Sequence, residues 1–156
     1  MVAASAVVPG DILILEAYGL TECTIGATSN REESFKFGTV GKALPGWELK
    51  VADDGELFIR SPTVFAGYYK DDEATAAILD GDGWLATGDI ATIDDEGFVT
   101  ITDRKKDILV TAGGKNVAPQ NLENELKTSR YVSQALVVGD RQPYIAALIT
   151  LDPVEI

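Results

Sequence analysis

Glu48-Leu-Lys-Val51, Asp53-Asp54-Gly55 and Glu56-Leu-Phe-Ile-Arg60 form the stretch that decides the fold class, because it reads as two strands around a tight turn. Apolar and polar residues alternate on both sides of the turn, which is the two-residue period of a half-buried strand. An Asp-Gly pair between such flanks is a strong local signal for a β-hairpin. The sequence therefore predicts antiparallel sheet in this part of the chain.

The same pattern recurs downstream. Residues 89–93, an acidic turn at 94–97 and residues 98–102 predict a second hairpin. Between the two hairpins, residues 72–79 begin with acids and continue with good helix formers, which predicts a short helix with an acidic N-cap. Residues 80–83, Asp-Gly-Asp-Gly, lack the ligand spacing and the terminal Glu of a calcium loop, so they are interpreted as the turn that ends this helix.

The pattern changes after residue 102. A charged run at 103–107 is expected to act as a hinge between a unit at 1–102 and a smaller unit at 108–156. Pro is favoured at the first position of a helix. The elements expected in the smaller unit are a strand at 108–110, a flexible glycine loop at 112–115, a helix from Pro119, and strands at 134–138 and 144–151. This βαββ order predicts one small sheet with a helix packed on it.

Composition excludes several classes of protein. The chain has 156 residues, 46% of them apolar, which is typical of a globular protein. Its net charge of −12 arises in residues 1–102, with 18 acids against 6 bases, and such a surface repels nucleic acid. The longest apolar runs are far too short for a transmembrane helix. With one Cys and no His, Cys23 is expected to pack rather than act as a nucleophile, and a cytoplasmic location is expected.

Three stretches carry groups that can hold a nucleotide: Tyr18-Gly19-Leu20-Thr21-Glu22, Thr87-Gly88-Asp89 and Asp103-Arg104-Lys105-Lys106. An aromatic ring can face a purine, and a Thr hydroxyl beside a Gly can approach a phosphate. A Glu can hold Mg²⁺, and an Asp can accept ribose hydroxyls. Each stretch alone is compatible with an ordinary loop, so the prediction depends on their combination.

These stretches, together with four others in the same order, resemble the adenylate-forming superfamily of acyl-CoA synthetases, luciferases and peptide-synthetase adenylation domains. The four others are Gly38-Thr-Val-Gly41 with Pro45, Gly55-Glu-Leu-Phe-Ile59, Gly67-Tyr68-Tyr69, and Val117-Ala-Pro119 through Glu123. The resemblance implies a strand-rich α+β fold. It would contain the β-barrel-like end of a large adenylation domain, joined by a hinge to an incomplete small α/β lobe.

The resemblance also implies roles for individual residues. The nucleotide, ATP or AMP, would be bound by Tyr18 on the adenine, Gly19 beside it, Thr21 on the phosphate, Asp89 on the ribose, and Arg104 on ribose or phosphate. Thr21 and Glu22 would be catalytic, and Glu22 would bind Mg²⁺. The pivot of the hinge would be Lys106.

Residues 111–116, Thr-Ala-Gly-Gly-Lys-Asn, look like the version found in bacterial long-chain fatty acyl-CoA synthetases. By that resemblance, Gly113 and Gly114 would line the CoA tunnel. The alternative that remains open is a tight turn that simply needs a positive φ.

The resemblance implies that the chain is part of an ATP-dependent long-chain fatty acid–CoA ligase, which forms acyl-AMP and then a thioester with CoA. The family's phosphate loop and its late catalytic Lys are not found in this sequence, so the chain alone is expected to be inactive. Exposed strand edges would favour self-association, and peripheral contact of the parent enzyme with a membrane stays open. The alternatives are a ligase that loads a carrier protein, and a truncated AMP-binding module without catalysis.

Overall fold

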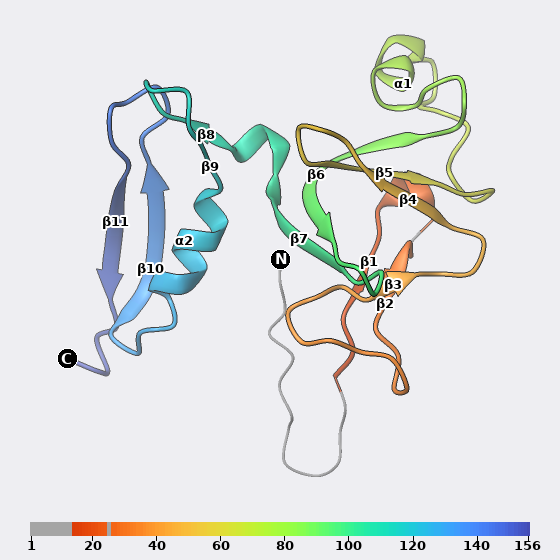
Figure 1. Ribbon diagram of the computed structural model, residues 1–156. Coiled ribbons are helices and arrows are strands. Elements are labelled where there is room, and N and C mark those ends of the chain that lie inside the picture. The colour runs from red at the N-terminus through yellow and green to blue at the C-terminus, as the bar shows by residue number, and fades with distance from the viewer. Residues whose placement is uncertain (1–13, 25) are drawn as a thin grey trace. The chain divides into compact units, whose positions relative to one another are not determined.

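The computed structural model describes residues 14–24 and 26–156. The chain has a strand-rich α+β fold, as predicted, and separates into two compact units between Ile101 and Thr102 (Figure 1).

The first unit is built on a curled four-stranded sheet whose strands lie in chain order. The strands are β4 (Glu48–Val51), β5 (Glu56–Arg60), β6 (Leu85–Ile93) and β7 (Val99–Arg104). The first predicted hairpin is confirmed, since β4 and β5 pair antiparallel with Leu49 opposite Ile59. The second is confirmed as well, although β6 begins four residues earlier than 89.

The predicted short helix is α1 (Asp72–Ile78). Its N-cap is Asp71, one residue before the acids expected to cap it, and the Asp71 carboxylate accepts a hydrogen bond from the Ala74 amide at 3.0 Å. The Asp-Gly-Asp-Gly stretch after the helix is the predicted turn. There the Asp80 carboxylate accepts hydrogen bonds from the amides of Asp82 and Trp84.

A small second sheet in the first unit was not predicted. It consists of β1 (Ala17–Tyr18), β2 (Thr28–Ser29) and β3 (Lys42–Ala43), with the 3₁₀ turn η1 (Thr21–Cys23) after β1. The two sheets share a core that includes Cys23, Ala27, Leu57, Ile59, Leu85 and Val99. Cys23 is fully buried there, and burial raises the pKa of its thiol, so the prediction that this residue packs is confirmed.

The second unit contains α2 (Pro119–Leu126), which begins at Pro119 as predicted and lies against the antiparallel pair β10 (Val132–Val138) and β11 (Ala146–Leu151) (Figure 1). Two buried carboxylates fix the helix. Asp103 accepts a hydrogen bond from the Gln120 amide at 3.1 Å, and Glu123 accepts one from the Val137 amide at 2.8 Å.

The prediction of one βαββ sheet is wrong. The strand expected at 108–110 is β8 (Leu109–Val110), and it pairs with β9 (Asn116–Val117) rather than with β10 or β11. The loop expected to be flexible is the turn of this hairpin, because the Thr111 amide donates to the Lys115 carbonyl at 3.0 Å. Closing so short a loop costs little conformational entropy, so the local pairing is favoured.

Candidate functional site

Tyr18 and Asp89 meet in the first unit, although 71 residues separate them in sequence. The Tyr18 hydroxyl donates a hydrogen bond to Asp89 Oδ2 at 2.6 Å. Asp89 is only 4% exposed, and a carboxylate so buried needs such a partner. Burial, and then the bond to Asp89, raise the pKa of the Tyr18 hydroxyl above its ordinary value, so Tyr18 stays a hydrogen-bond donor at neutral pH.

A bulge in the sheet presents Asp89 to Tyr18. Phe58 pairs with Ala86 and Glu56 pairs with Ile90, so the single residue Leu57 lies opposite the three residues of Thr87-Gly88-Asp89. Bulges re-aim side chains and are common beside active sites. This bulge needs Gly88, whose φ of +71° lies in the left-handed region.

Side chains satisfy the backbone groups that the bulge frees. The Gly88 amide donates to Glu56 Oε1 at 3.0 Å, and the Asp89 amide donates to Thr87 Oγ1 at 3.1 Å. The Thr87 hydroxyl in turn donates to the Leu57 carbonyl at 2.8 Å. The carboxylate of Asp89 is therefore held by a fixed frame, as a binding site requires.

Glu22 lies in η1, at the end of the predicted nucleotide-binding stretch that begins with Tyr18. Its Oε1 accepts a hydrogen bond from the Tyr68 hydroxyl at 2.7 Å. Mg²⁺ in proteins is commonly held by one or two carboxylates together with substrate phosphates and water, so this half-exposed carboxylate suits the ion. Thr21 begins η1 and Gly19 precedes it, and both are exposed.

The remaining predicted residues lie after the unit boundary at Ile101–Thr102, which β7 crosses, and so belong to the second unit. Arg104 is the last residue of β7, and its amide donates to Asp103 Oδ1 at 2.7 Å. Lys106 is the central residue of the 3₁₀ turn η2 (Lys105–Asp107). Gly113 and Gly114 form the β8–β9 turn, where only Gly114 has a positive φ, +78°. The turn conformation therefore explains the glycine at position 114 but not the one at 113. The expected contact of both with CoA stays a prediction.

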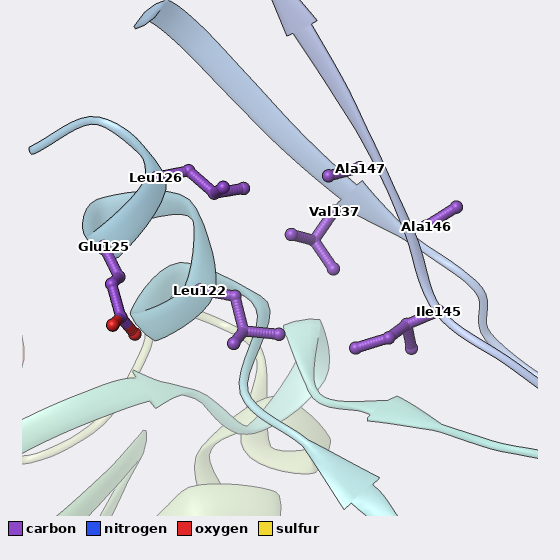
Figure 2. A pocket seen from close by; sticks show the side chains of 7 residues that line it. All are labelled: Leu122, Glu125, Leu126, Val137, Ile145, Ala146 and Ala147. Atoms are coloured by element: carbon purple, nitrogen blue, oxygen red, sulfur yellow. The ribbon is translucent and has the colours of Figure 1, made fainter. Parts of the chain in front are cut away.

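A groove of about 360 Å³ lies between α2 and the β10–β11 pair (Figure 2). Most of its lining is aliphatic, including Leu122, Leu126, Val137 and Ile145, and Glu125 is its one charged residue. None of the predicted site residues lines it, and no polar groups converge there to recognise a nucleotide.

Sequence reasoning missed three residues of the site: Thr87 and Glu56, which hold the bulge, and Tyr68, which contacts Glu22. The signal for Tyr68 and Thr87 was present, because both lie in stretches that carry the family resemblance. No periodic signal marked Glu56, because in the alternation of this strand it shares a face with Phe58 and Arg60 rather than with the core residues Leu57 and Ile59. Among the described residues, neither α1 nor α2 is long and apolar enough to traverse a bilayer.

Two sequence profiles of one enzyme family match this chain. The sequence profile of the AMP-binding enzymes matches residues 2–69, and the profile of the AMP-binding enzyme C-terminal domain matches residues 106–155. Long-chain-fatty-acid–CoA ligase FadD15 of Mycobacterium tuberculosis is 51% identical over 142 residues, which make up 91% of this chain and 24% of that protein. The chain thus spans about a quarter of the length of such curated relatives.

Two solved structures share the fold at significant sequence identity. An ATP-bound RpMatB-BxBclM chimera matches with a TM-score of 0.81 at 33% identity, over 92% of this chain and 31% of the chimera. O-succinylbenzoate coenzyme A synthetase from Bacillus subtilis, in complex with ATP and magnesium ion, matches with a TM-score of 0.77 at 30% identity, over 88% of this chain and 31% of that one. With both profiles matched in order and these relatives alongside, the chain belongs to the family of AMP-binding, adenylate-forming enzymes.

Proposed function

We propose that this chain supplies the adenylate-holding wall of an ATP-dependent fatty acid–CoA ligase. The observation that carries the proposal is the hydrogen bond between Tyr18 and Asp89, which joins two of the three predicted nucleotide-binding stretches within one unit. The relative FadD15, named as a long-chain-fatty-acid–CoA ligase, supports the reaction class and the substrate.

Each side chain has a chemical task in this proposal. A carboxylate offers about four lone-pair positions, so Asp89 can accept ribose hydroxyls while it accepts from Tyr18. The hydrogen bond keeps the carboxylate oriented before the sugar arrives, which reduces the entropy lost on binding. The ring of Tyr18 provides an apolar face for the adenine, and the exposed hydroxyl of Thr21 can donate to the α-phosphate.

The proposed reaction has two steps. A fatty acid carboxylate oxygen attacks the α-phosphorus of ATP and pyrophosphate leaves; the CoA thiol then attacks the acyl carbonyl and AMP leaves. In the first step negative charge spreads over the phosphoryl oxygens, and a Mg²⁺ ion held by Glu22 would supply the positive charge that stabilises it. Arg104 donates from its guanidinium to ribose or phosphate.

For the second step we propose that Lys106 is the pivot about which the second unit turns, and that the Gly113–Gly114 turn approaches CoA. Lys106 lies just after the β7 strand that crosses the unit boundary, where a change in a few dihedral angles would reorient the second unit. The single buried cysteine suits a cytoplasmic location.

The nucleotide site can be tested on the 156-residue chain with AMP and with 2′,3′-dideoxy-AMP, which lacks the hydroxyls assigned to Asp89. Isothermal titration should show tighter binding of AMP, by about 10-fold for hydrogen bonds to a charged group. Asp89→Asn keeps an acceptor for Tyr18 but loses the charge, so it should remove most of this discrimination.

Asp95→Asn is the matched control, because it removes the same charge from an exposed turn of the same unit. It should leave the preference for AMP unchanged. Equal binding of the two nucleotides by the wild-type chain, or equal effects of the two substitutions, would refute the assignment of Asp89 to the ribose.

A further inference from the structure

Tyr68 makes a contact that the proposed function does not explain. It lies 46 residues from Glu22 in sequence, yet its hydroxyl donates to Glu22 Oε1 at 2.7 Å. Tyr68 is 39% exposed, so its hydroxyl could hydrogen-bond to water at little cost. Burial in the core therefore does not explain why the Tyr68 hydroxyl bonds to Glu22.

The backbone around Tyr68 is attached to η1 at several points. The Phe65 amide donates to the Glu22 carbonyl at 2.7 Å, and the Thr24 hydroxyl donates to the Thr63 carbonyl at 3.0 Å. The segment 63–65 therefore runs along the 3₁₀ turn that carries Glu22. Because residues 63–65 are attached to this turn, Tyr68 lies within reach of the Glu22 carboxylate.

The side chain of Tyr68 is directed by its own surroundings. Its amide donates to Thr75 Oγ1 in α1 at 2.9 Å, and its ring meets the Phe65 ring edge to face, with centroids 5.0 Å apart. Gly67 has a φ of +139°, and a Cβ there would lie 2.8 Å from Thr75 Cγ2. Only glycine lets the chain approach α1 this closely and deliver the ring to Glu22.

We propose that Tyr68 is a positioning residue, which holds one oxygen of the Glu22 carboxylate so that the other faces the magnesium ion of a bound nucleotide. The inference rests on the proposed metal role of Glu22. Groups that hydrogen-bond to a metal-ligating carboxylate orient it, and their removal lowers metal affinity.

The test compares ATP binding to the full 156-residue chain in EDTA and in saturating Mg²⁺, by isothermal titration. The ratio of the two affinities measures how much the metal contributes. Tyr68→Phe keeps the ring on Phe65 and loses only the hydroxyl. It should reduce the Mg²⁺-dependent gain by about 10-fold and leave the affinity in EDTA unchanged.

Tyr69→Phe is the matched control, since the neighbouring ring is 87% exposed and contacts Lys70 rather than Glu22. It should change neither affinity. Glu22→Gln should abolish the Mg²⁺-dependent gain. If Glu22→Gln abolishes the gain while Tyr68→Phe behaves like Tyr69→Phe, the positioning role is refuted and the metal role stands. If the wild-type chain and Glu22→Gln respond equally to Mg²⁺, the metal role fails, and the inference fails with it.

Discussion

Gly41→Ala should destabilise the first unit far more than Gly46→Ala, although the two glycines have nearly the same backbone conformation. Their φ angles are +83° and +82°. An L-residue in this region costs about 1–2 kcal/mol, and both variants incur that cost. A Cβ on Gly41 would lie 1.9 Å from the Ser29 carbonyl carbon and 2.1 Å from the Asn30 nitrogen, whereas nothing lies within 4 Å at Gly46.

The backbone at Ser29 and Asn30 must move by more than an ångström to relieve this contact, because a Cβ atom does not approach another heavy atom within 3.0 Å. Ser29 pairs with Ala17 and Lys42, and the Asn30 amide donates to the Glu16 carbonyl at 2.8 Å. Two or three hydrogen bonds at about 1 kcal/mol each are then lost in addition to the strain. The expected total is about 4 kcal/mol, and β1, which carries Tyr18, is displaced with β2.

Urea unfolding followed by tryptophan fluorescence measures the difference, because Trp47 and Trp84 both report on the first unit. The midpoint for Gly41→Ala should fall well below that of Gly46→Ala, and AMP affinity should fall with it under native conditions. Unfolding free energies of the two variants within about 1 kcal/mol of each other would refute the argument, because strain alone predicts equality.

Two further predictions concern the buried polar groups. The pKa of Tyr18 is raised on folding, so its contribution to stability is complete below the ordinary tyrosine pKa of about 10 and is lost as pH rises above it. Ultraviolet titration of the folded chain should show one tyrosine that ionises after the others. Tyr18→Phe should remove this late step. In the second unit, Glu123→Ala should leave the Val137 amide without its acceptor, at a cost of about 1–3 kcal/mol. Hydrogen exchange at Val137 should then accelerate, whereas Glu125→Ala, which removes an exposed carboxylate from the same helix, should leave it unchanged.

Local pattern predicted the elements that depend on local interactions. The β4–β5 hairpin, α1 with its turn, and α2 with Pro119 at its start all depend on neighbours in sequence. The two-residue strands β1, β2 and β3 could not be predicted in this way, because they are too short to show a period. They exist through pairing with each other and packing on Cys23 and Ala27.

The partner of β8 was mispredicted for a related reason. The order of elements suggested that the strand at 108–110 would join the sheet of β10 and β11, and nothing in its three residues argues against this. The decisive information lies in the turn at Gly114, which brings Asn116 back beside Val110. Glycine at that position permits either a loop or a hairpin, so the sequence alone left the choice open.

Sequence patterns singled out Tyr18 and Asp89 but could not predict the contact between them. A bulge of one residue on β6 would reverse the inward and outward alternation beyond it and would be visible as a break in the pattern. The bulge at Thr87-Gly88-Asp89 places three residues opposite one, which is two more than regular pairing, so the alternation continues unbroken through Leu85, Asp89 and Ala91, all buried. The sequence thus hides the bulge and shows instead a carboxylate in phase with the core. A buried carboxylate requires a hydrogen-bond donor, and Tyr18 supplies one to Asp89. The same pair of side chains therefore stabilises the core of the sheet and forms the proposed binding site for the ribose.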